Sequence, residues 1–262
     1  MGRIQQSSGI INSIHLILLE IGELTLFASR FFKECFRRPF ERKEFLKQCY
    51  HLGNRSIFLV VLTAFIIGLV FTLQSRPKML ELGAAAWIPS MVSLSIVREI
   101  GPIITALICA GRIGSGIGAE LGSMRVTEQI DAMEVSGTNP FKYLVVTRIL
   151  ATTLTIPLLV VLGDAIALFG SFLVENIKGD VSFTYFFDEV FLTLHFKDIF
   201  PSTIKTFFFG FAIGLVGCYK GYYCKHGTVG VGMAANTAVV EASIMVFVID
   251  FLAVFVTDIF YA

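Results

Sequence analysis

Five ionisable residues interrupt otherwise apolar stretches of the sequence: Arg98, Glu99, Asp164, Lys205 and Asp250. An ionisable group at the centre of a membrane helix costs roughly 2.5 to 3.5 kcal/mol, so it must face protein or water and often marks a functional site. Arg98 and Glu99 are adjacent and point about 100° apart on a helix, so they cannot easily neutralise each other. Either these charges pair between helices and hold them together, or some of them line a polar path for a charged ligand.

The sequence carries none of the motifs on which the commoner catalytic chemistries depend. It has no P-loop, no G-x-S-x-G elbow, no H-E-x-x-H and no nicotinamide fingerprint. The glycine-rich run 111–118 follows no strand and lacks a terminal Lys-Ser/Thr, which favours close helix packing over phosphate binding. Five cysteines without a C-x-x-C pair, together with four histidines, indicate neither a disulfide framework nor a zinc site. We therefore predict no catalytic residue, no metal and no cofactor.

The composition is that of a membrane protein. Hydrophobic residues make up 55% and charged residues 16% of the 262 residues, whereas soluble domains carry about 25% charged residues. The mean hydropathy is +0.76. A net charge of +1 provides no basic excess for nucleic acid. The sequence predicts a single all-α integral membrane domain over residues 1–262.

Five stretches are long and apolar enough to cross a bilayer, for which about 20 residues are needed. The predicted spans are 56–73, 82–111, 149–174, 199–219 and 239–261. The second contains the Arg98-Glu99 pair near its middle, and the fifth contains Asp250.

Residues 14–32 are mostly apolar but include Glu20, Glu23 and Arg30. Their apolar residues recur at spacings of three and four, which gives one helical stripe. The stripe consists of Ile10, Ile14, Ile17, Ile21, Leu24, Ala28 and Phe31. A basic run follows, from Arg30 through Arg38 to Lys47. This pattern predicts that residues 1–55 comprise an amphipathic helix in the membrane interface and a basic segment. A full or re-entrant span is the alternative.

Between the second and third spans, the polar segment 112–148 must lie outside the hydrocarbon. Within it, residues 124–135 predict an amphipathic helix that stops at Gly137, with Val126, Ile130 and Met133 on one face. In the five-span topology, fifteen of the 21 Lys and Arg residues lie on the side of this segment and of the N-terminus. The positive-inside rule makes that side cytoplasmic.

Several blocks of sequence have a recognisable pattern. They are Arg98-Glu-Ile-Gly-Pro102, Ala110-Gly-Arg-Ile-Gly-Ser115, residues 119–133, Asn139-Pro-Phe-Lys-Tyr-Leu144, Lys205-Thr-Phe-Phe-Phe-Gly210, and Gly221 with Gly227-Thr-Val-Gly-Val-Gly232. Together they resemble the Mla-type permease family, the transmembrane subunits of ABC systems that move phospholipids across the Gram-negative envelope, with chloroplast relatives. The resemblance covers residues 48–262.

This resemblance implies a homodimeric permease in the inner membrane, bound to cytoplasmic ABC ATPase subunits and to a periplasmic MCE-type lipid-binding protein. ATP hydrolysis would then belong to the partner subunit. The residues implied to face or support the phospholipid cavity are Arg98, Glu99, Lys205 and Asp250. The residues implied to couple to the ATPase are Glu120, Glu128, Asp131 and Met133. In one departure from the family, the stretch 233–237 has no basic residue, and Glu241 is left without a role.

Two other functions are compatible with a membrane protein of this size: a non-transporting anchor for the lipid-binding protein, and a membrane-embedded lipid enzyme. An enzyme would need a nucleophile or a metal cluster near the interface, and the sequence suggests none. An anchor would need neither an amphipathic cytoplasmic helix nor charges in the middle of the membrane. A lipid-transporting permease accounts for both features.

Overall fold

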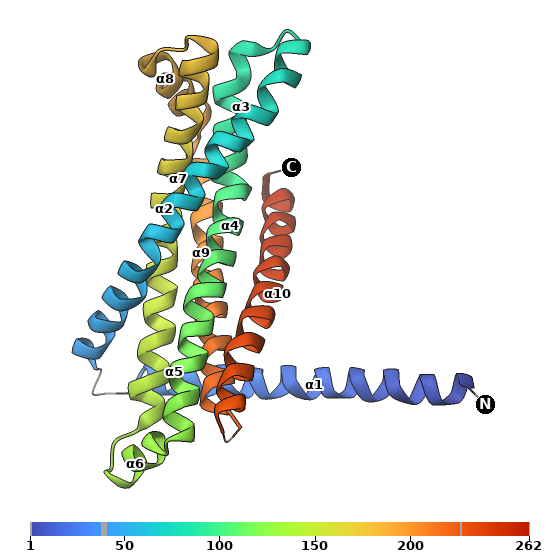
Figure 1. The fold of residues 1–262 in the computed structure, drawn as a ribbon, viewed down its shortest axis with the longest axis vertical. Coiled ribbons are helices and arrows are strands. Elements are labelled where there is room, and N and C mark those ends of the chain that lie inside the picture. Colours follow the sequence, from blue (N-terminus) through green and yellow to red (C-terminus); the bar gives the residue numbers. More distant parts are fainter. Residues whose placement is uncertain (1, 38–40, 226, 262) are drawn as a thin grey trace.

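The computed structural model describes residues 2–37, 41–225 and 227–261, with side chains from residue 18 to residue 259. Within these ranges all regular structure is helical (Figure 1). The α-helices are α1 (Gly2–Cys35), α2 (Arg42–Glu81), α3 (Ile88–Ser95), α4 (Gly101–Cys109), α5 (Ser115–Val126), α6 (Gln129–Val135), α7 (Thr147–Gly179), α8 (Phe183–Thr193), α9 (Phe196–Tyr222) and α10 (Thr228–Tyr261). The 3-10 turn η1 (Ala85–Trp87) and the π-helical segments η2 (Ile96–Ile100), η3 (Ala110–Gly114) and η4 (Phe141–Val146) join them.

Five continuous helical segments are long and apolar enough to cross a membrane, which confirms the number of predicted spans. They are Arg42–Glu81, Ala85–Val126, Phe141–Gly179, Phe196–Tyr222 and Thr228–Ile259. Each is longer than predicted, because hydropathy detects only the part of a helix that lies in hydrocarbon. The first has 40 residues and is therefore about 60 Å long, twice the thickness of the apolar core.

Two predicted loops are largely helical. Most of the segment 112–148 belongs to the ends of two long helices, since the second span continues to Val126 and the third begins at Phe141. The predicted loop 220–237 shortens to a few residues before α10 starts at Thr228. Glycine and polar residues lower the hydropathy of these segments, but their backbones continue the helical hydrogen bonding of the adjoining spans.

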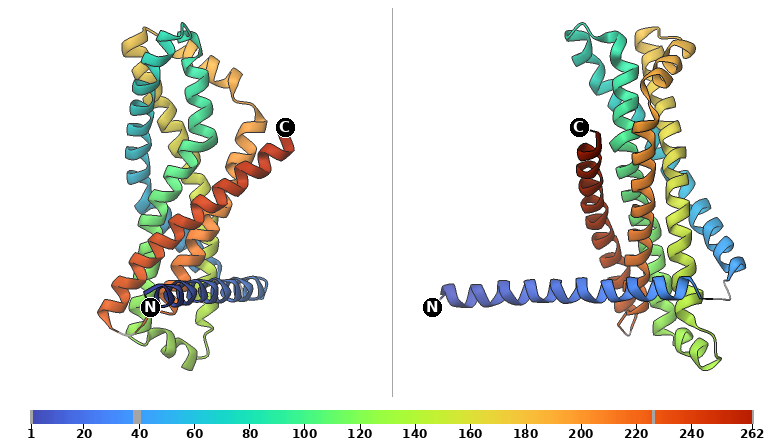
Figure 2. Two further views of the ribbon diagram at one scale, coloured as in Figure 1. Left: turned by 90° about the vertical axis from the view of Figure 1, so that its right-hand side faces the viewer. Right: turned by 180° about the vertical axis from the view of Figure 1, so that it is seen from behind.

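Helix α1 lies across one end of the bundle instead of running parallel to the five spans (Figures 1 and 2). Phe27 and Phe31 are each 3% exposed and anchor it against the bundle. This placement agrees with the predicted interfacial helix and not with the alternative of a full span. The side chains of Ile10, Ile14 and Ile17, and all of Arg38, lie outside the described residues.

Close helix contacts in the bundle are formed at glycines, as is typical of membrane helices. A Cβ atom on Gly68 of α2 would lie 1.9 Å from the carbonyl oxygen of Ala167 on α7. On α9, a Cβ atom on Gly210 would lie 2.6 Å from the carbonyl oxygen of Thr152, again on α7. Helix α7 can therefore contact both α2 and α9 directly through backbone atoms.

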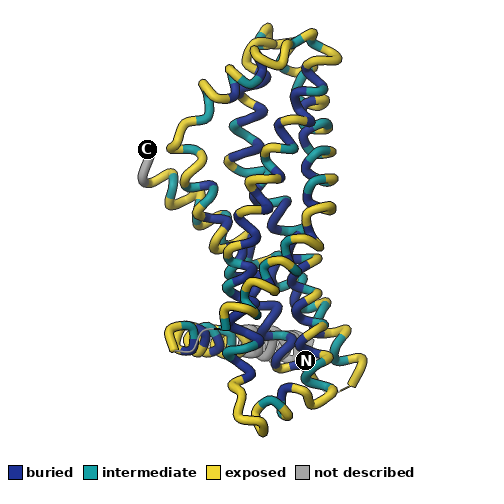
Figure 3. Tube along the Cα trace, turned by 90° about the vertical axis from the view of Figure 1, so that its left-hand side faces the viewer, coloured by how far each residue is buried: buried dark blue, intermediate teal, exposed yellow. Residues whose placement is uncertain are grey.

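Buried residues are concentrated where α2, α4, α5, α7 and α9 pack together (Figure 3). Helix α10 is more exposed, and none of its described residues beyond Val246 is buried. Its outer half carries large exposed apolar side chains. They are Phe247, Val248, Phe251, Leu252, Val254, Phe255, Val256 and Ile259. This half of α10 is the part of the bundle that is least constrained by packing within the chain.

Candidate functional site

The ammonium group of Lys205 joins three helical segments. Its Nζ atom lies 2.7 Å from Oε2 of Glu99 on η2 and 2.9 Å from Oδ1 of Asp250 on α10. The Lys205 side chain is 5% exposed, whereas that of Glu99 is 43% exposed. The two carboxylates satisfy the buried cation and leave this group of three with a formal charge of −1. A buried ammonium requires such pairing, because unpaired charges are strongly disfavoured in an apolar environment.

Glu99 occupies a π-helical turn. In η2 the backbone NH of Gly101 donates to the carbonyl of Ile96, and the hydroxyl of Ser202 on α9 donates to the carbonyl of Val97 at 2.6 Å. Short π-helical segments within α-helices are frequent at functional sites. Arg98 and Glu99 point in different directions from this turn, and each has a different partner.

Asp164 of α7 supports the same turn from the opposite side. A Cβ atom on Gly101 would lie 1.8 Å from Oδ1 of Asp164, so only glycine fits beside this carboxyl group. That oxygen is buried and has no hydrogen-bond partner among the described residues. The sequence singled out Asp164 as an ionisable residue within a span. In the structure it packs beside Gly101, and no ion pair of 4 Å or less joins it to Lys205.

Arg98 contacts Asp198, with 3.6 Å between Nε and Oδ1, and does not join Lys205. Both residues line a polar cavity of about 240 Å³ between η2, α9 and α10. Glu99, Lys205 and Asp258 also line this cavity, so it contains both cations and carboxylates. The structure thus brings Glu99, Lys205 and Asp250 into contact and places Arg98 at the rim of the same cavity.

An apolar groove of about 760 Å³ lies beside the polar cavity, between α9 and α10. Its apolar lining residues are Phe200, Ile204, Phe208, Ile249, Leu252 and Val256. The cavity and the groove share Pro201, Lys205, Ala253 and Thr257, so they are continuous. Within the Phe-rich run 207–211, Phe208 lines the groove, while Phe209 is fully buried in the core. A polar cavity joined to an apolar groove suits an amphipathic ligand.

The opposite end of the bundle carries the short helix α6. The predicted continuous helix 124–135 is wrong, because Glu128 adopts the left-handed conformation with φ +57° and separates α5 from α6. The predicted end of the helix is confirmed: Gly137 has φ +77°, a conformation that suits a glycine after a helix C-terminus. Ile130 is fully buried and Met133 packs against the same core. The apolar face of α6 is therefore directed toward the bundle.

The residues on the outside of α6 differ in their exposure and in whether they already bond within the chain. Asp131 Oδ1 accepts a hydrogen bond of 2.6 Å from Nη1 of Arg125 at the end of α5. Glu128 is exposed, and Val135 is 90% exposed. The outward surface of α6 is consequently formed more by Glu128 and Val135 than by Met133.

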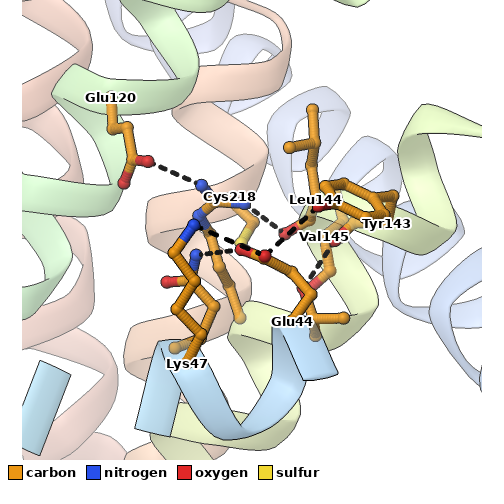
Figure 4. A network of polar contacts seen from close by, with 10 residues as sticks. Glu44, Lys47, Glu120, Tyr143, Leu144, Val145 and Cys218 are labelled. Atoms are coloured by element: carbon orange, nitrogen blue, oxygen red, sulfur yellow. Dashed lines mark hydrogen bonds and ion pairs between the residues drawn. The ribbon is translucent and has the colours of Figure 1, made fainter. Parts of the chain in front are cut away.

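Glu120 lies on α5 and not on α6. It forms an ion pair of 2.8 Å with Nη2 of Arg148, whose side chain is 3% exposed (Figure 4). Arg148 also donates to the carbonyl of Leu144 at 3.0 Å. Near this pair, Tyr143 donates to Glu44 of α2 at 3.2 Å (Figure 4). The sequence analysis did not single out Arg148, because it placed this residue in the polar segment 112–148. In the structure Arg148 links the start of α7 to α5 through Glu120. These two helices precede and follow α6 in the chain.

The sequence analysis also gave no role to Lys220, a second lysine of α9. Lys220 lies 2.5 Å from Oε1 of Glu241 on α10 and also pairs with Glu20 of α1. The adjacent hydroxyl of Tyr219 donates to Glu23 of α1 at 2.6 Å. Glu241, which the sequence left without a role, thus helps to hold α10 against α9. The spacing of the two lysines could have pointed to Lys220. Residues 205 and 220 lie within about 60° of each other around one helix, so Lys220 is on the same side of α9 as Lys205.

No group of three or more His, Cys, Asp or Glu residues suited to a metal ion occurs among the side chains that the structure describes.

Comparison with known proteins identifies relatives over nearly the whole chain. Residues 45–256 match the family described as Permease MlaE. A probable ABC transporter permease protein of Rickettsia felis is 36% identical over 241 residues, which cover 92% of each chain. A probable ABC transporter permease protein of Synechocystis is 35% identical and covers 80% of each chain. The chloroplastic protein TRIGALACTOSYLDIACYLGLYCEROL 1 of Arabidopsis thaliana is 32% identical, over 79% of this chain and 59% of that protein.

Proposed function

The chain belongs to the MlaE permease family of ABC transporters, and we propose that it moves phospholipids between the inner and outer membranes of a Gram-negative-type envelope. The observation that carries this proposal is the meeting of a polar cavity and an apolar groove at Lys205. A phospholipid has the same two parts, a charged headgroup and apolar chains. The plant relative, whose name refers to a galactolipid, is consistent with a lipid as cargo.

The charges of the cavity suit a phospholipid headgroup. Lys205 and Arg98 provide cations for the phosphate, and Arg can form two parallel hydrogen bonds to it. Glu99 and Asp250 orient Lys205 and can attract a headgroup amine. The exposed Phe208 and Leu252 of the groove would contact the acyl chains. Because Glu99 is far more exposed than Lys205, we expect the headgroup to approach from the side of Glu99.

We further propose that a cytoplasmic ABC ATPase docks at the end of the bundle that carries α6. Glu128, at the N-terminal cap of α6, and Asp131 within it are the proposed direct contacts, while Met133 would support them by packing α6 against the bundle. Glu120 would act through its pair with Arg148, which holds the helices on either side of α6. Hydrolysis of ATP would move these helices and, through α7 and α9, the cavity at the other end. A periplasmic MCE-domain protein would receive or deliver lipid there.

A homodimer fits the exposure of α10. The apolar outer half of this helix is unpacked within the chain, and the groove opens beside it. A second copy packed against this side would close the groove into a chamber with two Lys205 groups. In this arrangement the chain is a multi-pass protein of the cell inner membrane.

The proposed orientation predicts a cytoplasmic N-terminus and a periplasmic C-terminus. We expect alkaline phosphatase fused after residue 262 to be active, and a cytoplasm-dependent fluorescent protein at the same position to be dark. The physical reason is the concentration of Lys and Arg at the α1 and α6 end. A fluorescent and phosphatase-negative C-terminal fusion would reverse the orientation.

The transport proposal is tested by reconstitution. The chain is co-expressed with the ABC ATPase and the MCE protein of the same genome, purified as a complex, and placed in vesicles that contain fluorescent phosphatidylethanolamine. The proposal predicts ATP-dependent transfer of the labelled lipid to acceptor vesicles. A complex that assembles but transfers no lipid would instead indicate an anchor for the lipid-binding protein.

A further inference from the structure

The C-terminal part of α1, from Phe27 onward, contacts the connection after α6 and the start of the third span. Phe141 of that segment is fully buried, with its ring centroid 5.0 Å from that of Phe27. The guanidinium carbon of Arg30 lies 4.2 Å above the Phe141 ring. At the C-terminal end of α1, the carbonyl of Arg37 accepts a hydrogen bond of 2.5 Å from Nζ of Lys142. An interfacial helix is thus attached to the connection that follows α6.

Glu34 is the centre of this attachment. Its side chain is 11% exposed, and its two oxygens have different partners. Oε1 accepts a hydrogen bond of 2.7 Å from Nη1 of Arg37, and Oε2 accepts one of 3.2 Å from Nδ2 of Asn139. The side-chain oxygen Oδ1 of Asn139 in turn accepts a hydrogen bond of 3.2 Å from the backbone NH of Lys142. One buried carboxylate therefore holds Asn139, which lies two residues before the third span begins at Phe141.

Asn139, the residue that Glu34 contacts, lies in a short connection between α6 and the third span. Only four residues separate the end of α6 at Val135 from Pro140, and they include the turn at Gly137. Such a short connection transmits displacement, because few backbone dihedrals can absorb it. Any shift of α1 in the membrane interface would therefore move Asn139 and, through it, α6.

We infer that Glu34 is a positioning residue that links α1 to α6, so that the interfacial helix sets how α6 meets its partner. The inference rests on the proposed function in assigning ATPase contact to α6. Glu34 touches neither the lipid cavity nor the outward surface of α6. It acts through Asn139 alone, in a polar hollow of about 430 Å³ that is also lined by Arg37, Glu41 and Lys142.

The decisive variant is Asn139→Asp. It preserves the oxygen that accepts from Lys142, but it replaces the amide donor with a second carboxylate facing Glu34. Adding Glu34→Gln places an amide at position 34. This amide can donate to the new carboxylate at position 139, so the hydrogen bond is restored in the opposite direction. Asn176→Asp is the matched control, because Asn176 makes a similar hydrogen bond of 3.1 Å to the Val181 carbonyl at the other end of α7.

Two readouts are compared in the permease–ATPase complex in nanodiscs and vesicles: hydrogen exchange of residues 129–141, and labelled phosphatidylethanolamine transferred per ATP hydrolysed. We expect Asn139→Asp to speed the exchange about tenfold, the factor that corresponds to losing a hydrogen bond to a charged group, and to lower the transfer per ATP. The Asn139→Asp/Glu34→Gln variant is expected to recover both, and Asn176→Asp to change neither.

Unchanged exchange and transfer in Asn139→Asp would overturn the inference, as would a defect that Glu34→Gln does not repair. If the unaltered complex transfers no lipid, the proposed function fails. Hydrogen exchange of residues 129–141 still tests the role of Glu34 in that case. Faster exchange in Asn139→Asp that returns to the original rate in Asn139→Asp/Glu34→Gln would support it.

Discussion

Replacing Lys205 with alanine is expected to reduce ATP-driven phospholipid transfer by at least about tenfold and to destabilise the protein. The ammonium lies 2.7 Å from Glu99 and 2.9 Å from Asp250, so its removal leaves two like charges with no cation between them. Removing one partner of a buried ion pair costs about 3–5 kcal/mol. We expect a value near the lower limit, because the 43% exposure of Glu99 lets water screen its charge.

A neutral variant separates the two effects of Lys205. In Lys205→Met/Glu99→Gln/Asp250→Asn no charge remains, so no uncompensated buried charge is left to destabilise the protein. We expect its stability, measured by thermal unfolding in detergent, to approach that of the natural sequence while lipid transfer stays low. Recovery of both stability and transfer would mean that the three charges only hold helices together, and the headgroup site would be withdrawn.

The second large effect is expected at the contact between α2 and α7. In Gly68→Ala the new methyl group would lie 1.9 Å from the carbonyl oxygen of Ala167, a backbone atom that cannot move aside alone. The two helices must separate, at a cost of about 3 kcal/mol, which corresponds to the upper part of the range for overpacked cores. The free energy of unfolding in mixed micelles measures this loss.

Gly116→Ala is the matched control for Gly68→Ala. Gly116 lies within α5, and a Cβ atom there would meet nothing within 4 Å. Alanine favours a helix over glycine by about 1 kcal/mol, so this variant should be neutral or slightly more stable. Equal destabilisation by the two substitutions would show that loss of glycine itself, and not the contact with Ala167, is responsible.

Hydropathy was sufficient to predict the five spans, because a long uncharged run such as 56–73 has no stable place outside a bilayer. The end of α6 just before Gly137 was also predictable, since a left-handed residue after a helix is most often glycine. The stripe in residues 14–32 predicted one amphipathic helix, and α1 does lie across the end of the bundle and not beside the spans (Figures 1 and 2). Its glutamates pair with polar residues of α9, which one helix considered alone cannot reveal.

The sequence identified which charges were unusual but not their partners. Glu99, Lys205 and Asp250 meet because α9 and α10 cross beside η2, and the crossing depends on close contacts that hydropathy does not encode. The left-handed Glu128 illustrates a local limit: residues 124–135 have helical periodicity, yet tertiary packing divides them. Arg148 was missed because a buried arginine and a loop arginine look alike until the helix around them is known.

Lipid bound to the purified protein tests the central claim most directly. The chain is extracted in mild detergent, and the lipids that remain bound are identified by mass spectrometry, in parallel for the natural sequence, Lys205→Ala and the control Gly116→Ala. The account predicts that phospholipid is retained by the natural sequence and by Gly116→Ala, and that most of it is lost from folded Lys205→Ala. Equal phospholipid in all three proteins, or none in the natural sequence, would contradict a headgroup site at Lys205.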